Sequence, residues 1–307
     1  MARSEWILRE DECSRHFQMD GPFWFICAQH QDRSVFIKTE DYDIAVNSAA
    51  IAAARTGVKV YIDVYMSNHG HWLVGCRTVQ EAESFFEEWA VQISQWEIRK
   101  GLKSNLRSWP YKVYDVPDLR AFRNITAYIA RNGYEAIKDT TPYSYAWGSA
   151  DLFFNGTLRD NDSGRPYSDL TVREKKAICH SHNYELPDNY RVKDGRILKT
   201  SYIQMPGVQL FFNSGNQYFN MLARNSTSDI EISRMIGEKI MLPDDEVYSA
   251  ISSICSKEYG KSLKEINVNQ RWDLAKKMRF DYNSNNRQIA QILRIPIGDI
   301  ERVFPKG

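Results

Sequence analysis

The sequence predicts an α+β fold: a ferredoxin-like antiparallel sheet with helices on one face, followed by an all-helical C-terminal domain. One observation behind this is that residues 22 to about 154 alternate in the order strand, helix, strand, strand, helix, strand, helix. Another is that the apolar spacing becomes helical from about residue 229 onward. A chain of 307 residues with 43% hydrophobic content can form such domains without disulfide or metal staples.

The individual elements follow from periodicity and from the residues that interrupt it. Residues 58–66 alternate apolar and polar positions, which is typical of a half-buried strand, and Ser67-Asn68 separates them from a second strand to form a hairpin. Glycines directly after the apolar runs end the helices. The predicted elements are strand 23–28, helix 41–56, strand 58–66, strand 69–76, helix 79–100, short strand 111–113 and helix 117–131.

We expect three regions along the chain: residues 1–155, a linker region 156–226, and a helical domain 227–307. The linker region begins in a polar run and contains Asp194-Gly195, a signal for a two-residue β-hairpin turn. In the last region, helices are predicted at 244–259, 270–280, 283–293 and 297–304. The final pair, joined at Ile295-Pro296, has the size of a helix-turn-helix.

Several classes of protein are excluded by composition. The most apolar stretches, 22–28 and 44–54, are far shorter than the roughly 18 residues of a membrane-spanning helix. The N-terminus lacks the apolar core of a secretory signal, so we expect a soluble, cytoplasmic protein. Five scattered cysteines without a Cys-x-x-Cys pair indicate neither a disulfide framework nor a cysteine zinc site.

The charge distribution is more informative than the net charge of +1. Between residues 99 and 131, basic side chains outnumber acidic ones and alternate with aromatic rings, a mixture found in channels that bind nucleic acids. A solvated helix face would show the same charges. The basic residues are Arg99, Lys100, Lys103, Arg107, Lys112, Arg120, Arg123 and Arg131, and the rings are Trp109, Tyr111, Tyr114 and Phe122.

Two histidines in the second hairpin strand are the first candidate site residues. His69 and His71 are two apart, so on a strand both project from one face, while Trp72 projects from the opposite, packed face. Two imidazoles on one face can share a metal ion. Paired histidines on a strand are more often hydrogen-bonded without metal, and that reading stays open.

The helix predicted at 117–131 carries the next candidates. Tyr128 and Asn132 are four apart and therefore share one side of the helix. A phenol has a reference pKa of about 10 and is a weak nucleophile at neutral pH, but a nearby divalent cation can polarise its target phosphate. The alternative is that Tyr128 is an ordinary aromatic at the rim of an amphipathic helix.

These residues resemble two motifs of the single-tyrosine HUH transposases, and most closely of their REP-associated tyrosine transposase branch. Met66–Val74 matches the Met-x-Asn-His-x-His strand followed by a hydrophobic run, with Gly70 where the family usually has a bulky hydrophobic residue. Tyr128–Asn132 matches the helical Tyr-Ile-x-x-Asn-Pro motif, with Gly133 where the proline usually lies.

Two weaker matches extend this resemblance to about residues 20–155. Tyr143–Ser149 resembles the family's Asp-Tyr-x-Trp-Ser-Ser segment. Phe36–Tyr42 resembles the Ile-Phe-x-x-x-x-Asp-Tyr approach to the first helix.

The resemblance implies cleavage and rejoining of single-stranded DNA by a catalytic domain at residues 1–155. Tyr128 would attack the scissile phosphate and form a 5′-phosphotyrosine, leaving a free 3′-hydroxyl. His69, His71 and Asn132 would hold Mg²⁺ or Mn²⁺, with the substrate phosphate and waters completing the shell. The implied partner is single-stranded or hairpin DNA, and the protein would act as a monomer or homodimer.

Basic residues are expected to bind this DNA. Lys103, Arg107, Arg120 and Arg123 would contact phosphates, and Arg302 on the last helix would reach a groove. The alternative for the C-terminal helices is a small bundle packed on the catalytic domain. The alternative for the whole chain is a non-catalytic nucleic-acid-binding protein that uses the ferredoxin-like fold only to stack and hold a strand.

Two other sets of residues are alternatives to these site residues, and neither is expected to have their role. His180 and His182 repeat the spacing of the first pair, but no matching tyrosine helix follows, so solvated histidines are expected there. Tyr134 is a possible competing nucleophile, and we expect Gly133 to end the helix before it.

Overall fold

The computed structural model describes residues 7–30, 34–102, 109–136, 145–155, 164–180, 185–224, 244–282 and 284–305. It divides into two compact units, Met1–Arg224 and Asn225–Gly307. The first unit is an α+β structure around a four-stranded antiparallel sheet, and the described part of the second is helical, which confirms the predicted fold class.

The central sheet has the strand order β2-β3-β1-β4. Its strands are β1 (Phe23–Gln29), β2 (Lys59–Tyr65), β3 (His69–Gly75) and β4 (Tyr111–Asp115). Every adjacent pair is antiparallel, and the predicted hairpin joins β2 to β3. This is the order that a ferredoxin-like plan requires of these four strands.

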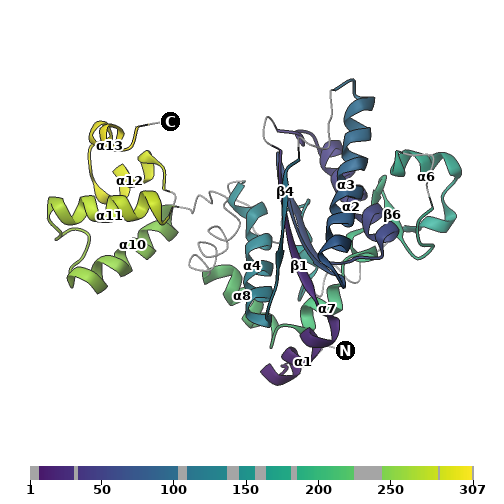
Figure 1. Cartoon of the computed structure of the whole chain (residues 1–307), viewed down its shortest axis with the longest axis horizontal. Helices are drawn as coiled ribbons and strands as arrows, with labels where there is room; N and C mark the ends of the chain where they lie inside the picture. Colours follow the sequence, from purple (N-terminus) through teal and green to yellow (C-terminus); the bar gives the residue numbers. More distant parts are fainter. Residues whose placement is uncertain are drawn as a thin grey trace. The chain divides into compact units, whose positions relative to one another are not determined.

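Helices cover both faces of this sheet, so the prediction of helices on one face is wrong in this detail (Figure 1). α2 (Thr39–Thr56) and α3 (Val79–Arg99) lie on one face, and α4 (Leu119–Ala136) lies on the other. Two successive residues of β3 show that helices cover both faces. The Trp72 ring packs against Trp89 of α3, with 4.8 Å between the ring centroids, and the His71 ring packs against Tyr128 of α4, with 5.3 Å between the centroids.

Because of this second layer, β2 differs from its prediction. Residues 58–66 were expected to form a half-buried strand, but every residue of β2 except Lys59 is buried. Tyr61, beside a shift in the β2–β3 register, packs against Phe122 of α4 and Phe211. Both faces of the strand are therefore removed from solvent.

Among the helices outside the predicted set, three pack near α4: α1 (Glu10–Asp20), α7 (Met205–Leu210) and α8 (Gly215–Arg224). α1 packs against α4 and α7, and α8 packs against α4. Together they extend the layer on the α4 face of the sheet.

The region expected to be a linker contains a small sheet of its own. β5 (Arg165–Pro166), β6 (Arg191–Lys193) and β7 (Arg196–Ile197) pair antiparallel, with α6 (Val172–Cys179) between β5 and β6. Asp194 and Gly195 both have positive φ, 52° and 78°, as a two-residue hairpin turn with this sequence requires. The predicted hairpin is confirmed, and it belongs to the first compact unit.

One asparagine attaches this hairpin to α2. The Asn47 side chain donates to the carbonyl of Gly195 at 3.0 Å and accepts from the Ile197 N–H at 2.8 Å. Arg196 adds an ion pair with Asp43 at 2.7 Å. The buried Asn47 thus serves as a short pairing partner for β7, the last strand in the order β5-β6-β7.

Hydrogen bonds to the buried residue Asp63 connect residues 145–203 to β2. Asp63 accepts hydrogen bonds at 2.7 Å from the hydroxyls of both Tyr65 and Tyr202. Its backbone also pairs with Ser149, and burial raises the pKa of the Asp63 carboxyl. Trp72 donates to the Tyr65 hydroxyl at 3.1 Å, so this network reaches the strand that carries the histidines.

The second unit contains four helices among its described residues: α10 (Asp244–Tyr259), α11 (Val268–Phe280), α12 (Asn286–Leu293) and α13 (Ile297–Val303). All four contribute to one hydrophobic core. A three-residue turn joins α12 to α13, and Arg294 adopts the left-handed conformation there, with φ 53°. Helix-turn-helix turns usually have glycine at this position, and here an arginine takes its conformation.

Among the residues that the structure describes, no helix combines the length and the apolar character needed to cross a lipid bilayer.

We expect Asn47→Ala to lower the free energy of unfolding by about 2 kcal/mol, because it leaves the buried Ile197 N–H and the Gly195 carbonyl without their partner. Urea denaturation measures this loss. Ser48→Ala is the control, since the neighbouring hydroxyl bonds only within α2, to the Ile44 carbonyl. Equal stability of wild type and Asn47→Ala would show that other contacts hold the hairpin.

Candidate active site

The two histidines of β3 lie side by side on the face that α4 covers. Their ring centroids are 5.2 Å apart, and His69 Nδ1 lies 3.0 Å from Asn68 Oδ1. His69 is half-buried and His71 is fully buried. The alternation of a strand therefore has the effect expected for this pair: both rings share one face, and Trp72 occupies the other.

Tyr128 of α4 contacts His71 of this pair although it lies far along the chain. Its ring is 5.3 Å from the His71 ring and 5.9 Å from the Phe25 ring of β1. One turn later, the Asn132 amide nitrogen donates to the backbone carbonyl of Tyr128 at 3.0 Å. That bond uses the nitrogen of the carboxamide and not its oxygen.

Burial sets the electrostatics of the site. Desolvation lowers the pKa of His71 to about 3, so this imidazole is neutral at physiological pH. Tyr128 is 3% exposed. A histidine that stays neutral keeps a nitrogen lone pair, but neither His71 nor Tyr128 is open to solvent in this conformation.

The donor set fits a divalent cation in part. A neutral imidazole binds transition metals, and a carboxamide oxygen is a ligand for hard cations, so His69, His71 and Asn132 are compatible with Mn²⁺ and less so with Mg²⁺. No group of three His, Cys, Asp or Glu side chains within the described ranges is arranged to hold a metal. Any ion here would need ligands from the substrate and from water.

Two residues of β1 complete the site and were missed in the sequence. Cys27 is the cross-strand partner of His71, and Phe25 packs between Tyr114 and Tyr128. Both lie on the His71 face, because antiparallel partners project from the same side of a sheet. Their alternation with Trp24 and Ile26 is the signal, but it becomes useful only when the register between β1 and β3 is known.

The structure explains why residue 70 is glycine. A Cβ atom on Gly70 would lie 2.6 Å from the tip of the Trp72 indole. The indole covers this position on the α3 face, so a larger side chain at residue 70 has no room while Trp72 is present.

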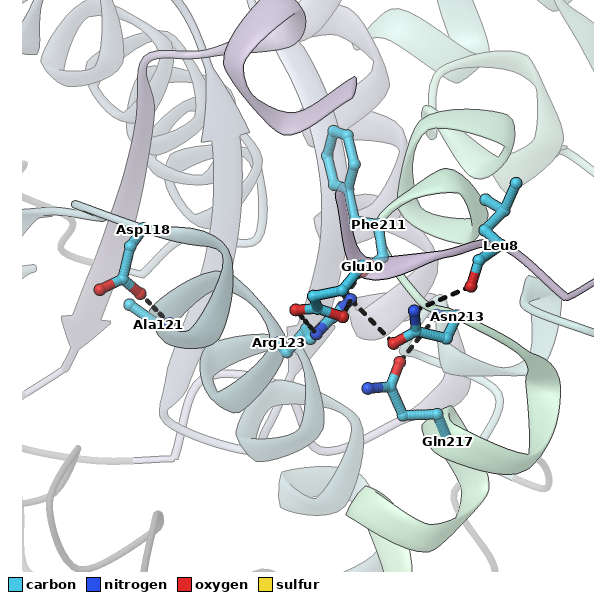
Figure 2. A network of polar contacts seen from close by, with 8 residues as sticks. All are labelled: Leu8, Glu10, Asp118, Ala121, Arg123, Phe211, Asn213 and Gln217. Atoms are coloured by element: carbon cyan, nitrogen blue, oxygen red, sulfur yellow. Dashed lines mark hydrogen bonds and ion pairs between the residues drawn. The ribbon is translucent and has the colours of Figure 1, made fainter. Parts of the chain in front are cut away.

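Arg123, which we expected to bind DNA, is instead a buried structural residue (Figure 2). Its guanidinium makes two hydrogen bonds to Glu10, at 2.7 and 3.0 Å, and one to the Phe211 carbonyl at 2.7 Å. Asn213 accepts a further bond and also pairs with the backbone of Leu8. The expectation for Arg123 is wrong because its guanidinium forms the hydrogen bonds that connect α1 and the end of α7 to α4.

The other expected DNA contacts have different outcomes. Lys103 and Arg107 lie outside the described residues, and Arg120 is exposed in the first turn of α4. Arg302 is exposed on α13, where it forms an ion pair with Asp299 at 3.2 Å. Two rings of the expected nucleic-acid channel, Trp109 and Phe122, are core residues and offer no surface for stacking.

The structure describes part of the alternative histidine pair and the helix of the alternative tyrosine. His180 ends α6 in the left-handed conformation, and His182 lies outside the described residues. Gly133 does not end its helix, because α4 continues to Ala136 and includes Tyr134.

In metal-free protein kept in EDTA, we expect the free energy of unfolding to fall as the pH is lowered from about 6.5 toward about 3. In that range the unfolded His71 takes up a proton that the folded, buried ring refuses. Its contribution to the slope approaches about 1.4 kcal/mol per pH unit. Urea denaturation at several pH values should show a flatter slope for His71→Gln than for the wild type. Equal slopes in the two proteins would contradict the assignment.

Comparison with known proteins adds little to this geometry. No protein-family model and no curated protein matches the sequence. A solved structure that matches is described as a REP-associated tyrosine transposase bound to a REP hairpin, with 16% identity and a TM-score of 0.36 over 42% of this chain and 77% of that one. A match with a TM-score this low carries neither fold, activity nor substrate over to this chain.

Proposed function

We propose that this chain is a metal-dependent single-stranded DNA endonuclease and strand transferase that works through a 5′-phosphotyrosine. The observation that carries the proposal is the contact of the Tyr128 ring with His71, itself beside His69. A phenol next to two imidazoles on the same sheet face brings a nucleophile to a possible cation site. The motif resemblance at Met66–Val74 and Tyr128–Asn132 points to the same residues.

In this mechanism the Tyr128 oxygen attacks the scissile phosphorus and loses its proton. The bond between the phosphorus and the 3′-oxygen breaks, and the departing 3′-oxygen gains a proton. The reverse attack by a 3′-hydroxyl restores the phosphodiester and frees the tyrosine. His69, His71 and Asn132 would hold Mn²⁺ or Mg²⁺, which when bound offsets the negative charge on the phosphate oxygens.

The burial of the two central rings adds a requirement. With Tyr128 at 3% exposure and His71 at 0%, a DNA strand reaches the phenol only after side chains around it move. We infer that the conformation described is the closed form of the site and that substrate binding opens it.

The same burial favours a second candidate function. If Tyr128 and His71 are only core residues, the chain is a non-catalytic nucleic-acid-binding protein on this fold. A covalent complex between protein and oligonucleotide distinguishes the two, because only the enzyme forms one.

We expect Tyr128→Phe to abolish covalent complex formation on single-stranded oligonucleotides that tile the DNA flanking the gene. Only the attacking oxygen is removed and the ring survives, so the dissociation constant for the same oligonucleotides should change little. Denaturing gels measure the adduct, and Tyr134→Phe is the matched control with wild-type yield. An adduct that survives in Tyr128→Phe and disappears in Tyr134→Phe would transfer the role to Tyr134.

We expect EDTA to stop cleavage and Mn²⁺ or Mg²⁺ to restore it. His69→Ala or His71→Ala should lower the rate by about a hundredfold or more, because one imidazole and one amide form a weak site. Mn²⁺ binding measured by calorimetry or by its electron paramagnetic resonance signal gives a readout independent of activity. His16→Ala should retain both activity and binding. Cleavage that persists in EDTA with both β3 histidines replaced would rule out the metal role.

A further inference from the structure

The second unit contains a hollow, lined by charged, polar and apolar side chains, that the proposed active site does not involve. It has a volume of about 460 Å³ and lies where the end of α11 meets the starts of α12 and α13. The residues around it are Arg279, Asn285, Asn286, Arg287, Ile297 and Glu301.

The net charge of the lining residues suits an anionic ligand. Two arginines and one carboxylate line the hollow, and Arg287 is exposed at the start of α12. Arg279 reaches the Ser284 carbonyl only through a long contact of 3.4 Å. Asn286 is 7% exposed and donates to the Phe304 carbonyl, while its Oδ1 accepts no hydrogen bond from a described residue.

The adjoining helix presents an unobstructed outer face. Ile300 and Phe304 anchor α13 in the core, while Ile297 is 46% exposed and Glu301 is exposed one turn later. A Cβ atom on Gly298 would meet nothing within 4 Å. The start of α13 is thus a narrow edge with open space beside it.

We propose that this hollow binds a backbone phosphate of duplex DNA and that α13 enters the adjacent major groove. In a helix-turn-helix, the first helix crosses the phosphate backbone and the second helix reads the groove with its N-terminal half. α12, the three-residue turn and α13 have that arrangement, and the arginines lie at the end where the backbone would pass. A guanidinium is the side chain best suited to a phosphate at such a place.

Duplex DNA fits better than the other possible occupants. A single strand is held mainly by stacked aromatic rings, and no aromatic residue lines the hollow. A-form RNA has a major groove too narrow for a helix. The proposal does not depend on the proposed nuclease activity, since it concerns the other compact unit.

The test uses the full-length chain and a blunt 20-base-pair DNA duplex, with excess oligo(dT) to occupy any single-strand site. Fluorescence anisotropy at several salt concentrations gives affinity and salt dependence. We expect Arg279→Gln and Arg287→Gln each to weaken binding about tenfold at low salt and to reduce the log–log salt slope by nearly one. Lys257→Gln on α10, which does not line the hollow, should match wild type.

Gly298 provides a variant that leaves the arginines intact. Gly298→Ala should bind like wild type, because its methyl group has room, whereas Gly298→Glu should lose at least tenfold in affinity by placing a carboxylate against the DNA. Melting curves check that each variant is folded.

The outcomes separate this proposal from the nuclease. Weaker duplex binding by Arg279→Gln, Arg287→Gln and Gly298→Glu, with the yield of covalent adduct on single strands unchanged, supports the proposal. This conclusion does not depend on the adduct yield of Tyr128→Phe. No duplex binding by wild type, equal binding of duplex RNA, or wild-type affinity in both Arg287→Gln and Gly298→Glu would overturn it.

Discussion

The burial of β3 on both of its faces is the constraint from which the rest of the first unit follows. His71 projects toward α4 and Trp72 projects toward α3, so two helical layers meet at adjacent residues of one strand. The strand cannot shift by one residue without exchanging an imidazole for an indole. The position of the histidines is therefore set as much by packing on the opposite face as by contacts at the site.

Polar contacts between distant segments hold this arrangement in place. Asp63 accepts hydrogen bonds from two tyrosine hydroxyls, and Asn47 donates to and accepts from the backbone of the hairpin. Arg123 donates to Glu10 of the N-terminal helix and to the Phe211 carbonyl at the end of α7. Each is buried and each has several partners, which is the condition under which a buried polar group stabilises a fold. These directional bonds add to the apolar contacts that attach the same segments, such as Phe17 of α1 and Phe211 after α7, which both pack against Phe23 of the sheet.

Much of the fold was predictable from local patterns, and the boundaries of the four strands are close to those expected. Period-two alternation placed His69 and His71 on one face, and Asp194-Gly195 marked the hairpin. Charge says nothing about burial, however, and the partners of Arg123 lie 113, 90 and 88 positions away, so its structural role could not be read from the sequence. Amphipathic spacing likewise shows that α4 has a buried side but not which face of the sheet it covers. The metal and nucleophile roles in the candidate site stay predictions.

The close fit of Gly70 and Trp72 means that the size of the side chain at one position limits the size at the other, in evolution as well as in the structure. A larger residue at 70 has no room while the indole is present, and loss of the indole alone would open a cavity between β3 and α3. Neither position can drift by itself without cost. Relatives with a bulky residue between their two histidines should therefore have a smaller side chain in place of the tryptophan, and the two residues should vary as a pair among sequences of this kind.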